Sequence, residues 1–235
     1  MTLKSVQLET KEPANQFQID SYHSRGPVQM GPWTSHMWRD DPRHLGFLLA
    51  RYKFCAKILS GRKKVLEIGC GDAFGISVVK QTVLEIHGID LEPLVLEDAK
   101  NRLQDEEQGG ITLSVHDMTA ATMNQQFDAA YSLDVIEHIP FLHENKFMEN
   151  LSASLSEHSI CILGTPNITA SRYASRFAAE GHINLKSSET LYELMSSYFH
   201  HCLLFSMNDE VVHTGFYPMA HYLLAVGIEL KQREI

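Results

Sequence analysis

A short apolar strand that ends in a glycine-rich turn is the feature that most constrains this chain. Residues 65–75 read VLEIGCGDAFG, so the strand runs directly into three closely spaced glycines. Gly69 and Gly71 allow the backbone to approach a ligand, and Gly75 permits close packing of the helix that follows. The next apolar run, LEIHGID, ends in Asp90, whose carboxylate can accept hydrogen bonds from both hydroxyls of a ribose. Together these features predict a nucleotide-like ligand held over a strand–turn–helix unit.

Apolar runs alternate with helical patterns from Lys64 onward, which predicts an α/β protein with a doubly wound, Rossmann-like parallel sheet of about seven strands. The last two strands have no room for a helix between them, so we expect them to form an antiparallel pair. The expected strands are 64–69, 84–89, 111–115, 127–132, 158–163, 201–206 and 221–229. The expected helices are 73–81, 92–105, 143–155 and 188–199.

A segment rich in aromatic residues precedes this pattern. Residues 21–41 hold both tryptophans of the chain, Trp33 and Trp38, and two Gly-Pro steps, at 26–27 and 31–32. We expect the steps to exclude a helix, and the segment to form either an ordered lid or a coil that covers apolar surface. The prediction is therefore a tail and lid over 1–41 and one α/β domain over 42–235.

A helix is expected directly after this segment. Asp41 is typical of an N-cap and Pro42 of the first helical position. Apolar residues then recur at helical spacing until Gly61 ends the pattern. We expect this helix to complete a helical and aromatic cap.

Composition limits the classes of partner. The net charge of −9 disfavours a protein that binds long nucleic acid through its phosphates, but leaves room for a short RNA end in a pocket. Four scattered cysteines, none in a C-x-x-C pair, indicate reduced and buried thiols. No apolar run reaches the roughly 18 residues of a membrane span and no signal peptide is evident, so we expect a cytoplasmic location.

The spacing of the glycines separates two classes of nucleotide site. A dinucleotide dehydrogenase would carry G-x-G-x-x-G, whereas here the third glycine comes one residue later. This spacing, preceded by Glu67, resembles the first motif of class I S-adenosylmethionine-dependent methyltransferases. The ammonium and sulfonium groups of that cofactor need acceptors rather than a phosphate cradle, and Glu67 and Asp72 place carboxylates at the turn. Alternatively, Glu67 caps a loop and Asp72 caps the next helix.

The resemblance continues along about 42–230. Asp117 and Met118 follow the third expected strand, where the family holds the adenine edge. The run FDAAYSL at 127–133 is similar to the family's fourth-strand motif. The resemblance implies a cofactor site formed by Glu67, Gly69, Gly71, Asp72, Asp90, Leu91, Asp117, Met118 and Ser132.

A second cluster follows the fourth strand. Asp134, Glu137 and His138 stand at positions i, i+3 and i+4, which is one face of a helical turn. Two carboxylates and an imidazole at the carboxyl end of a parallel strand have the composition of a metal site.

Here the chain resembles two metal-dependent branches, the plant small-RNA 3′-end methyltransferases and the ubiquinone-biosynthesis O-methyltransferases. Their motif is Glu-x-x-Glu-His. Glu137 and His138 match it directly, and His182 matches the downstream histidine of the small-RNA branch. Asp134 stands where the branches have Glu, and its side chain is one methylene shorter. The resemblance implies Mg²⁺, Mn²⁺ or Zn²⁺ on Asp134, Glu137, His138 and His182.

Two other interpretations of the second cluster remain open. His138 could act as a general base without metal, with Glu137 beside it, or these side chains could have a purely structural role. The expected activity is methyl transfer from S-adenosylmethionine to a hydroxyl of a small polar acceptor, such as a sugar or a glycan-linked group. The alternatives are an RNA-end methyltransferase and a non-catalytic partner protein that binds the cofactor.

Overall fold

The computed structural model describes residues 9–103, 109–174 and 176–232 of the chain. It divides the chain into two compact units, residues 1–30 and 31–235. The described part of the first unit holds a short 3-10 helix, η1 (Pro13–Asn15), and the helix α1 (Gln16–Arg25). The first eight residues of the predicted tail lie outside the described part.

The expectation that the aromatic segment contains no helix is wrong. It holds the end of α1 and all of α2 (Pro32–Asp40). The Gly-Pro steps separate two helices rather than interrupt one, because Gly26 ends α1 with a φ of 77° and Pro32 begins α2.

The second unit is built around one eight-stranded sheet with the order β3-β2-β1-β4-β5-β8-β6-β7. Strands β1 to β5 are mutually parallel, and β8 lies antiparallel to both β5 and β6. The strands are β1 (Lys64–Ile68), β2 (Glu85–Asp90), β3 (Ile111–Val115), β4 (Phe127–Leu133), β5 (Leu155–Pro166), β6 (Phe199–Asn208), β7 (Val211–His213) and β8 (Tyr222–Leu230).

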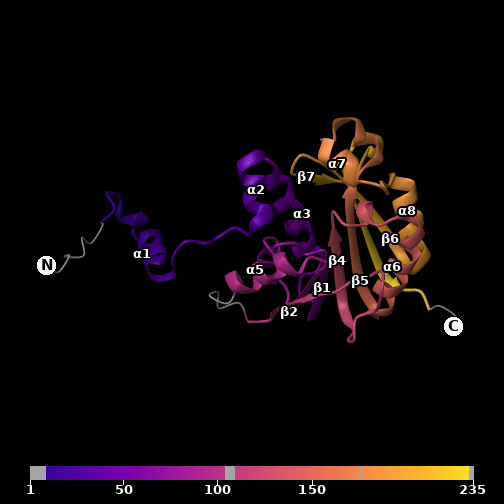
Figure 1. Cartoon of the computed structure of the whole chain (residues 1–235), viewed down its shortest axis with the longest axis horizontal. Coiled ribbons are helices and arrows are strands. Elements are labelled where there is room, and N and C mark those ends of the chain that lie inside the picture. The colour runs from indigo at the N-terminus through magenta and orange to yellow at the C-terminus, as the bar shows by residue number, and fades with distance from the viewer. Residues whose placement is uncertain (1–8, 104–108, 175, 233–235) are drawn as a thin grey trace. The chain divides into compact units, whose positions relative to one another are not determined.

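Helices cover both faces of the sheet and give three layers (Figure 1). One apolar core joins the sheet to α3 (His44–Ile58), α4 (Ile76–Lys80) and α5 (Pro93–Leu103). The other joins it to α6 (Phe141–Ala153) and α8 (Ser188–Tyr198). Shorter elements are η2 (Ile136–His138), η3 (Ile168–Tyr173), α7 (Arg176–Gly181) and η4 (Tyr217–Met219).

The sequence predicts the sheet, but several element bounds differ from expectation. The α/β sheet and the antiparallel final strands are confirmed, but β7 adds an eighth strand. The helix after the aromatic segment begins at His44 with Arg43 as N-cap, and Asp41 instead forms an ion pair with Arg43 at 3.0 Å. The short helix α4 begins at Ile76 rather than residue 73, and β5 begins at Leu155 rather than residue 158.

The four cysteines are free thiols, three of them buried. Among the described residues, no helix is long and apolar enough to cross a membrane.

Candidate active site

The glycine-rich turn joins β1 to α4 at the carboxyl end of the parallel strands. Gly69 and Gly71 both adopt positive φ angles, 76° and 54°. A Cβ on Gly69 would lie 2.2 Å from a methyl of Val135, and one on Gly71 would lie 2.7 Å from the Trp33 ring. Only glycine combines this conformation with this lack of space.

Asp90 at the end of β2 holds the turn in place. Its Oδ2 accepts a hydrogen bond from the backbone N–H of Gly71 at 2.8 Å, and its Oδ1 accepts one from Glu92 at 3.0 Å. Each carboxylate oxygen has further lone pairs for a ligand. Asp90 therefore both shapes the turn and presents acceptors beside it.

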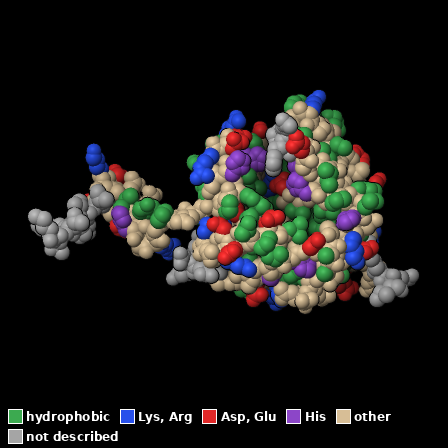
Figure 2. Space-filling model, viewed as in Figure 1, with side chains coloured by type: hydrophobic (Ala, Val, Ile, Leu, Met, Phe, Trp, Pro, Cys, Tyr) green, Lys and Arg blue, Asp and Glu red, His purple; other side chains and the backbone are tan. Residues whose placement is uncertain are grey.

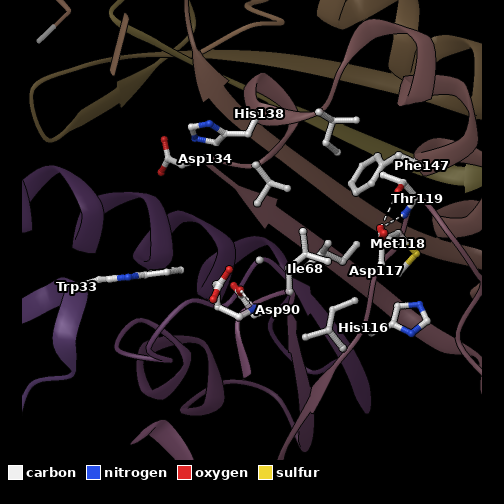
Figure 3. A pocket seen from close by; sticks show the side chains of 16 residues that line it. Trp33, Ile68, Asp90, His116, Asp117, Met118, Thr119, Asp134, His138 and Phe147 are labelled. Atoms are coloured by element: carbon white, nitrogen blue, oxygen red, sulfur yellow. Dashed lines mark hydrogen bonds between the residues drawn. The ribbon is translucent and has the colours of Figure 1, made fainter. Parts of the chain in front are cut away.

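A first cavity of about 500 Å³ opens beside Asp90. Figure 3 shows Asp90 on one side of the cavity, Asp134 and His138 on another, and Trp33 pointing in from α2. The structure brings seven of the predicted residues to its wall: Gly69, Asp90, Leu91, Asp117, Met118, Asp134 and His138.

Asp117 and Met118 form the far wall of this cavity, after β3. The hydroxyl and the backbone N–H of Thr119 donate to Asp117 Oδ1 at 2.7 and 2.8 Å, and these hydrogen bonds lower the pKa of the carboxyl group. Met118 is buried beneath it. This wall combines an apolar surface with a carboxylate that stays ionised.

A second cavity of about 350 Å³ adjoins the first, and Trp33, Gly69 and Asp134 line both. This face of the molecule is hollowed, with histidine and acidic side chains gathered around apolar ones (Figure 2). The predicted residues on the second wall are Gly69, Gly71, Asp72, Asp134, Glu137 and His182.

Asp72 ties the turn to α2. Its Oδ2 accepts from the backbone N–H of Thr34 at 2.8 Å, and its Oδ1 accepts from the Thr34 hydroxyl at 2.9 Å. Thr34 lies in the first turn of α2, so the carboxylate satisfies an otherwise unpaired helix N–H from 38 residues away. Asp72 therefore caps a helix, but α2 rather than the one that follows it, and Trp33 is held over the turn.

Glu67 and Ser132 are not among the residues that line either cavity. The Glu67 carboxylate is buried and accepts hydrogen bonds from Tyr52 at 3.0 Å and Tyr131 at 2.7 Å. Burial raises its pKa to about 7, against the opposing effect of the two hydroxyls. The Ser132 hydroxyl donates to the backbone oxygen of Ile68 at 3.1 Å. Both side chains support the turn from inside the core.

Glu137, His138 and His182 form a compact group after β4 and α7. One potential ligand atom from each lies within 4.8 Å of the others. Burial, followed by the charge of Asp134, raises the pKa of Glu137 to about 8. Its Oε2 accepts from the Thr165 hydroxyl at 3.0 Å, while its buried Oε1 has no hydrogen-bond partner among the described residues.

The two imidazoles of this group are oriented toward each other. Their ring centroids are 5.1 Å apart. His138 Nδ1 lies 3.0 Å from the backbone oxygen of Gly181, and this carbonyl acceptor assigns the proton to Nδ1 and leaves Nε2 with a free lone pair. Burial lowers the pKa of His182. His138 Nε2 and the His182 ring can therefore each offer a lone pair to a ligand.

The structure separates Asp134 from this group. Its Oδ2 pairs with Arg51 Nη1 at 2.6 Å, and Asp134 is not among the potential ligands that lie together. Its φ of 58° is in the left-handed region, a strain that is often found at functional sites. The ion pair with Arg51 opposes the predicted ligand role of Asp134.

Arg51 and Thr34 are site residues that the sequence analysis missed. The Arg51 guanidinium is buried and stacks over the Tyr222 ring at 3.8 Å. The available signal was its position on the apolar face of α3, beside Leu48 and Tyr52 at helical spacing. For Thr34 no signal existed, because its partner Asp72 is remote in sequence.

Comparison with known proteins identifies the family. A family model described as a methyltransferase domain matches residues 37–198. The chain belongs to this methyltransferase family. No curated protein matches it.

Several solved structures share the fold at low sequence identity. The methyltransferase domain of bacterial CtHen1-C is 19% identical, with a TM-score of 0.65, over 78% of this chain and 98% of that one. The N-methyltransferase NodS from Bradyrhizobium japonicum WM9, in complex with S-adenosylhomocysteine, is 16% identical, with a TM-score of 0.60, over 89% and 98%. The DhpI–SAM–HEP complex is 13% identical, with a TM-score of 0.58, over 93% and 99%.

Proposed function

We propose that this methyltransferase uses S-adenosylmethionine to methylate a hydroxyl of a small polar acceptor, such as a sugar or a glycan-linked group. The observation that carries the proposal is the pair of adjoining cavities, which meet at Trp33, Gly69 and Asp134. Two ligands that meet at such a junction can exchange a group directly.

The first cavity suits the cofactor. Its volume is in the usual range for small-molecule sites, and Asp90, Asp117 and Met118 line it. In this proposal Asp90 accepts from the ribose hydroxyls, the wall at Asp117 and Met118 holds the adenine, and Gly69 and Gly71 allow the methionine part to approach the backbone. When bound, the cofactor supplies a methyl group activated by its positive sulfur.

Glu137, His138 and His182 suit a divalent cation. Glu137 Oε1 is a buried polar atom without a hydrogen-bond partner among the described residues, and such an atom requires one. The three ligand atoms lie close enough to share one ion. Two imidazoles and one carboxylate favour Zn²⁺ or Mn²⁺ over Mg²⁺. A bound cation would lower the pKa of an acceptor hydroxyl.

The protein's own groups set the geometry of the site whether or not a cation is bound. The Gly181 carbonyl fixes the His138 ring, so that Nε2 can bind a cation or accept a proton as a general base. In this proposal Trp33, whose neighbour Thr34 is held by Asp72, lies over the junction of the two cavities.

Two alternatives remain, and one of them has a specific observation in its favour. The likeness to CtHen1-C supports an RNA-end methyltransferase, but the net charge of −9 disfavours it. A non-catalytic partner protein would bind the cofactor at the same turn without methyl transfer. We also propose a lid over residues 1–41, a catalytic domain over residues 42–235 and a cytoplasmic location.

A transfer assay with a radiolabelled methyl group tests the proposal. Sugars with vicinal hydroxyls, amines and short RNA oligomers are offered in parallel, each with added Mn²⁺ or with a chelator. We expect transfer to a sugar hydroxyl, lost with the chelator and in His138→Ala. Transfer that survives chelation and re-purification would exclude the cation, and transfer only to amines or RNA would exclude the proposed acceptor.

A further inference from the structure

A buried ion pair lies close to residues 182–185, which we call the His182 segment. The Nζ of Lys186 pairs with Oε2 of Glu144, and the two side chains are only 5% and 9% exposed. Asn184 completes a triad, because its Nδ2 donates to the same Glu144 oxygen at 2.7 Å and its Oδ1 accepts from Lys186 Nζ at 2.8 Å. Glu144 comes from α6, whereas the other two follow α7 directly.

The backbone of this segment is fastened to the Glu137–His138 turn on both sides of His182. Before it, the Gly181 oxygen accepts from the His138 ring at 3.0 Å. After it, the Asn184 N–H donates to the Glu137 oxygen at 3.0 Å. The segment is thus hydrogen-bonded directly to Glu137 and His138, the two residues that would share a cation with His182.

Stability alone gives little reason for this triad. A buried ion pair contributes little net stability compared with well-packed apolar residues, because both charges lose their hydration. Residues 182–185 lie outside any helix or strand, so a regular hydrogen-bond ladder does not fix their position. An ion pair shared with an amide fixes one arrangement of the segment, since any other arrangement would leave a buried charge unpaired.

We propose that Lys186, Glu144 and Asn184 are positioning residues that hold the His182 imidazole beside His138 and Glu137 for cation binding. The inference rests on the proposed function for the cation itself. The placement of the His182 ring is a separate consequence, which can be measured without any cation.

The test replaces the ion pair by apolar residues of similar length, in Lys186→Met/Glu144→Met. The matched control is Lys146→Met/Glu149→Met, because Lys146 and Glu149 form an exposed pair on the same helix, α6, at 3.9 Å. Co²⁺ affinity is measured by absorption titration, and S-adenosylhomocysteine affinity by calorimetry. Ring ¹⁵N resonances of His182 are assigned with His182→Gln.

We expect the buried double variant to bind Co²⁺ about 10- to 100-fold more weakly, the range typical of groups that orient a metal ligand. Its affinity for S-adenosylhomocysteine should change less than twofold, and its His182 resonances should shift or broaden. The control should match the wild type in all three measurements. Wild-type Co²⁺ affinity and unchanged His182 resonances in the buried variant would overturn the proposal.

Two further results keep the test decisive. If the buried double variant does not fold, Asn184→Leu removes the amide from the triad while leaving the ion pair, and should weaken Co²⁺ binding and shift the His182 resonances in the same way. If the wild type binds no Co²⁺, the cation in the proposed function is wrong. Unchanged His182 resonances in the variant then separately refute the positioning role.

Discussion

The buried carboxyl group of Glu67 should make the stability of this protein depend on pH. Glu67 is 2% exposed and is hydrogen-bonded to two tyrosine hydroxyls. Burial raises its pKa from an ordinary 4.5 to about 7 in the folded state. Between these two values the folded chain holds a proton that the unfolded chain has lost, so the free energy of unfolding should fall as pH rises through this window.

The size of the effect follows from the shift. At 1.36 kcal/mol per pKa unit, the difference corresponds to about 3 kcal/mol lost between pH 4.5 and pH 7. Below pH 4.5 the carboxyl group is protonated in both states, and its contribution is constant. Other carboxylates add their own dependence, so the prediction concerns the difference between wild type and a Glu67 variant.

Urea denaturation at several pH values measures this difference. Glu67→Gln cannot ionise, so its unfolding free energy should lack this fall, and the variant should gain on the wild type as pH rises from 4.5 to 7. The matched control is Glu85→Gln, an exposed position on β2 that leaves the tyrosine–carboxyl group intact and should retain the wild-type dependence. Parallel curves for wild type and Glu67→Gln would refute the reasoning.

Three further predictions concern the turn and its cover. Gly75→Ala places a Cβ 2.0 Å from the Tyr52 ring and should lower the unfolding free energy by about 1–3 kcal/mol; an unchanged urea midpoint would contradict this. Thr34→Val removes the hydroxyl bonded to Asp72. Because the carboxylate is buried, this change should lower the free energy of unfolding by about 1–3 kcal/mol. Thermal unfolding measures the change, with Thr34→Ser as the conservative control. Because Trp33 lines both cavities, S-adenosylhomocysteine should change tryptophan fluorescence in the wild type, and an equal change in Trp33→Phe would argue against that placement.

The parallel half of the sheet was predictable because its central strands, β1 and β4, are buried along almost their whole length. Such strands appear as continuous apolar runs, and β1, β3 and β4 begin at the predicted residues. The helix α2 could not be predicted in this way, because glycine and proline break a helix internally but also mark its ends. The structure decides which of the two applies at Gly26 and Pro32.

The site, too, was only partly predictable from the sequence. Gly69 and Asp90 could be placed together, because the carboxyl ends of neighbouring parallel strands meet at one edge. Two contacts organise the rest of the site. Arg51 pairs with Asp134, which is 83 positions away in the sequence, and Asn184 bonds to Glu144, which is 40 positions away. No local pattern encodes such pairs, so the sequence could not show that Asp134 pairs with an arginine.

The most direct test of the central claim is calorimetric titration of S-adenosylhomocysteine into the wild type and Asp90→Ala, with Glu97→Ala on α5 as an exposed control. We expect one site per chain in the wild type and in the control. Binding should be at least tenfold weaker in Asp90→Ala, because that carboxylate shapes the turn and faces the first cavity. No binding to the wild type, or equal affinity in all three proteins, would contradict it.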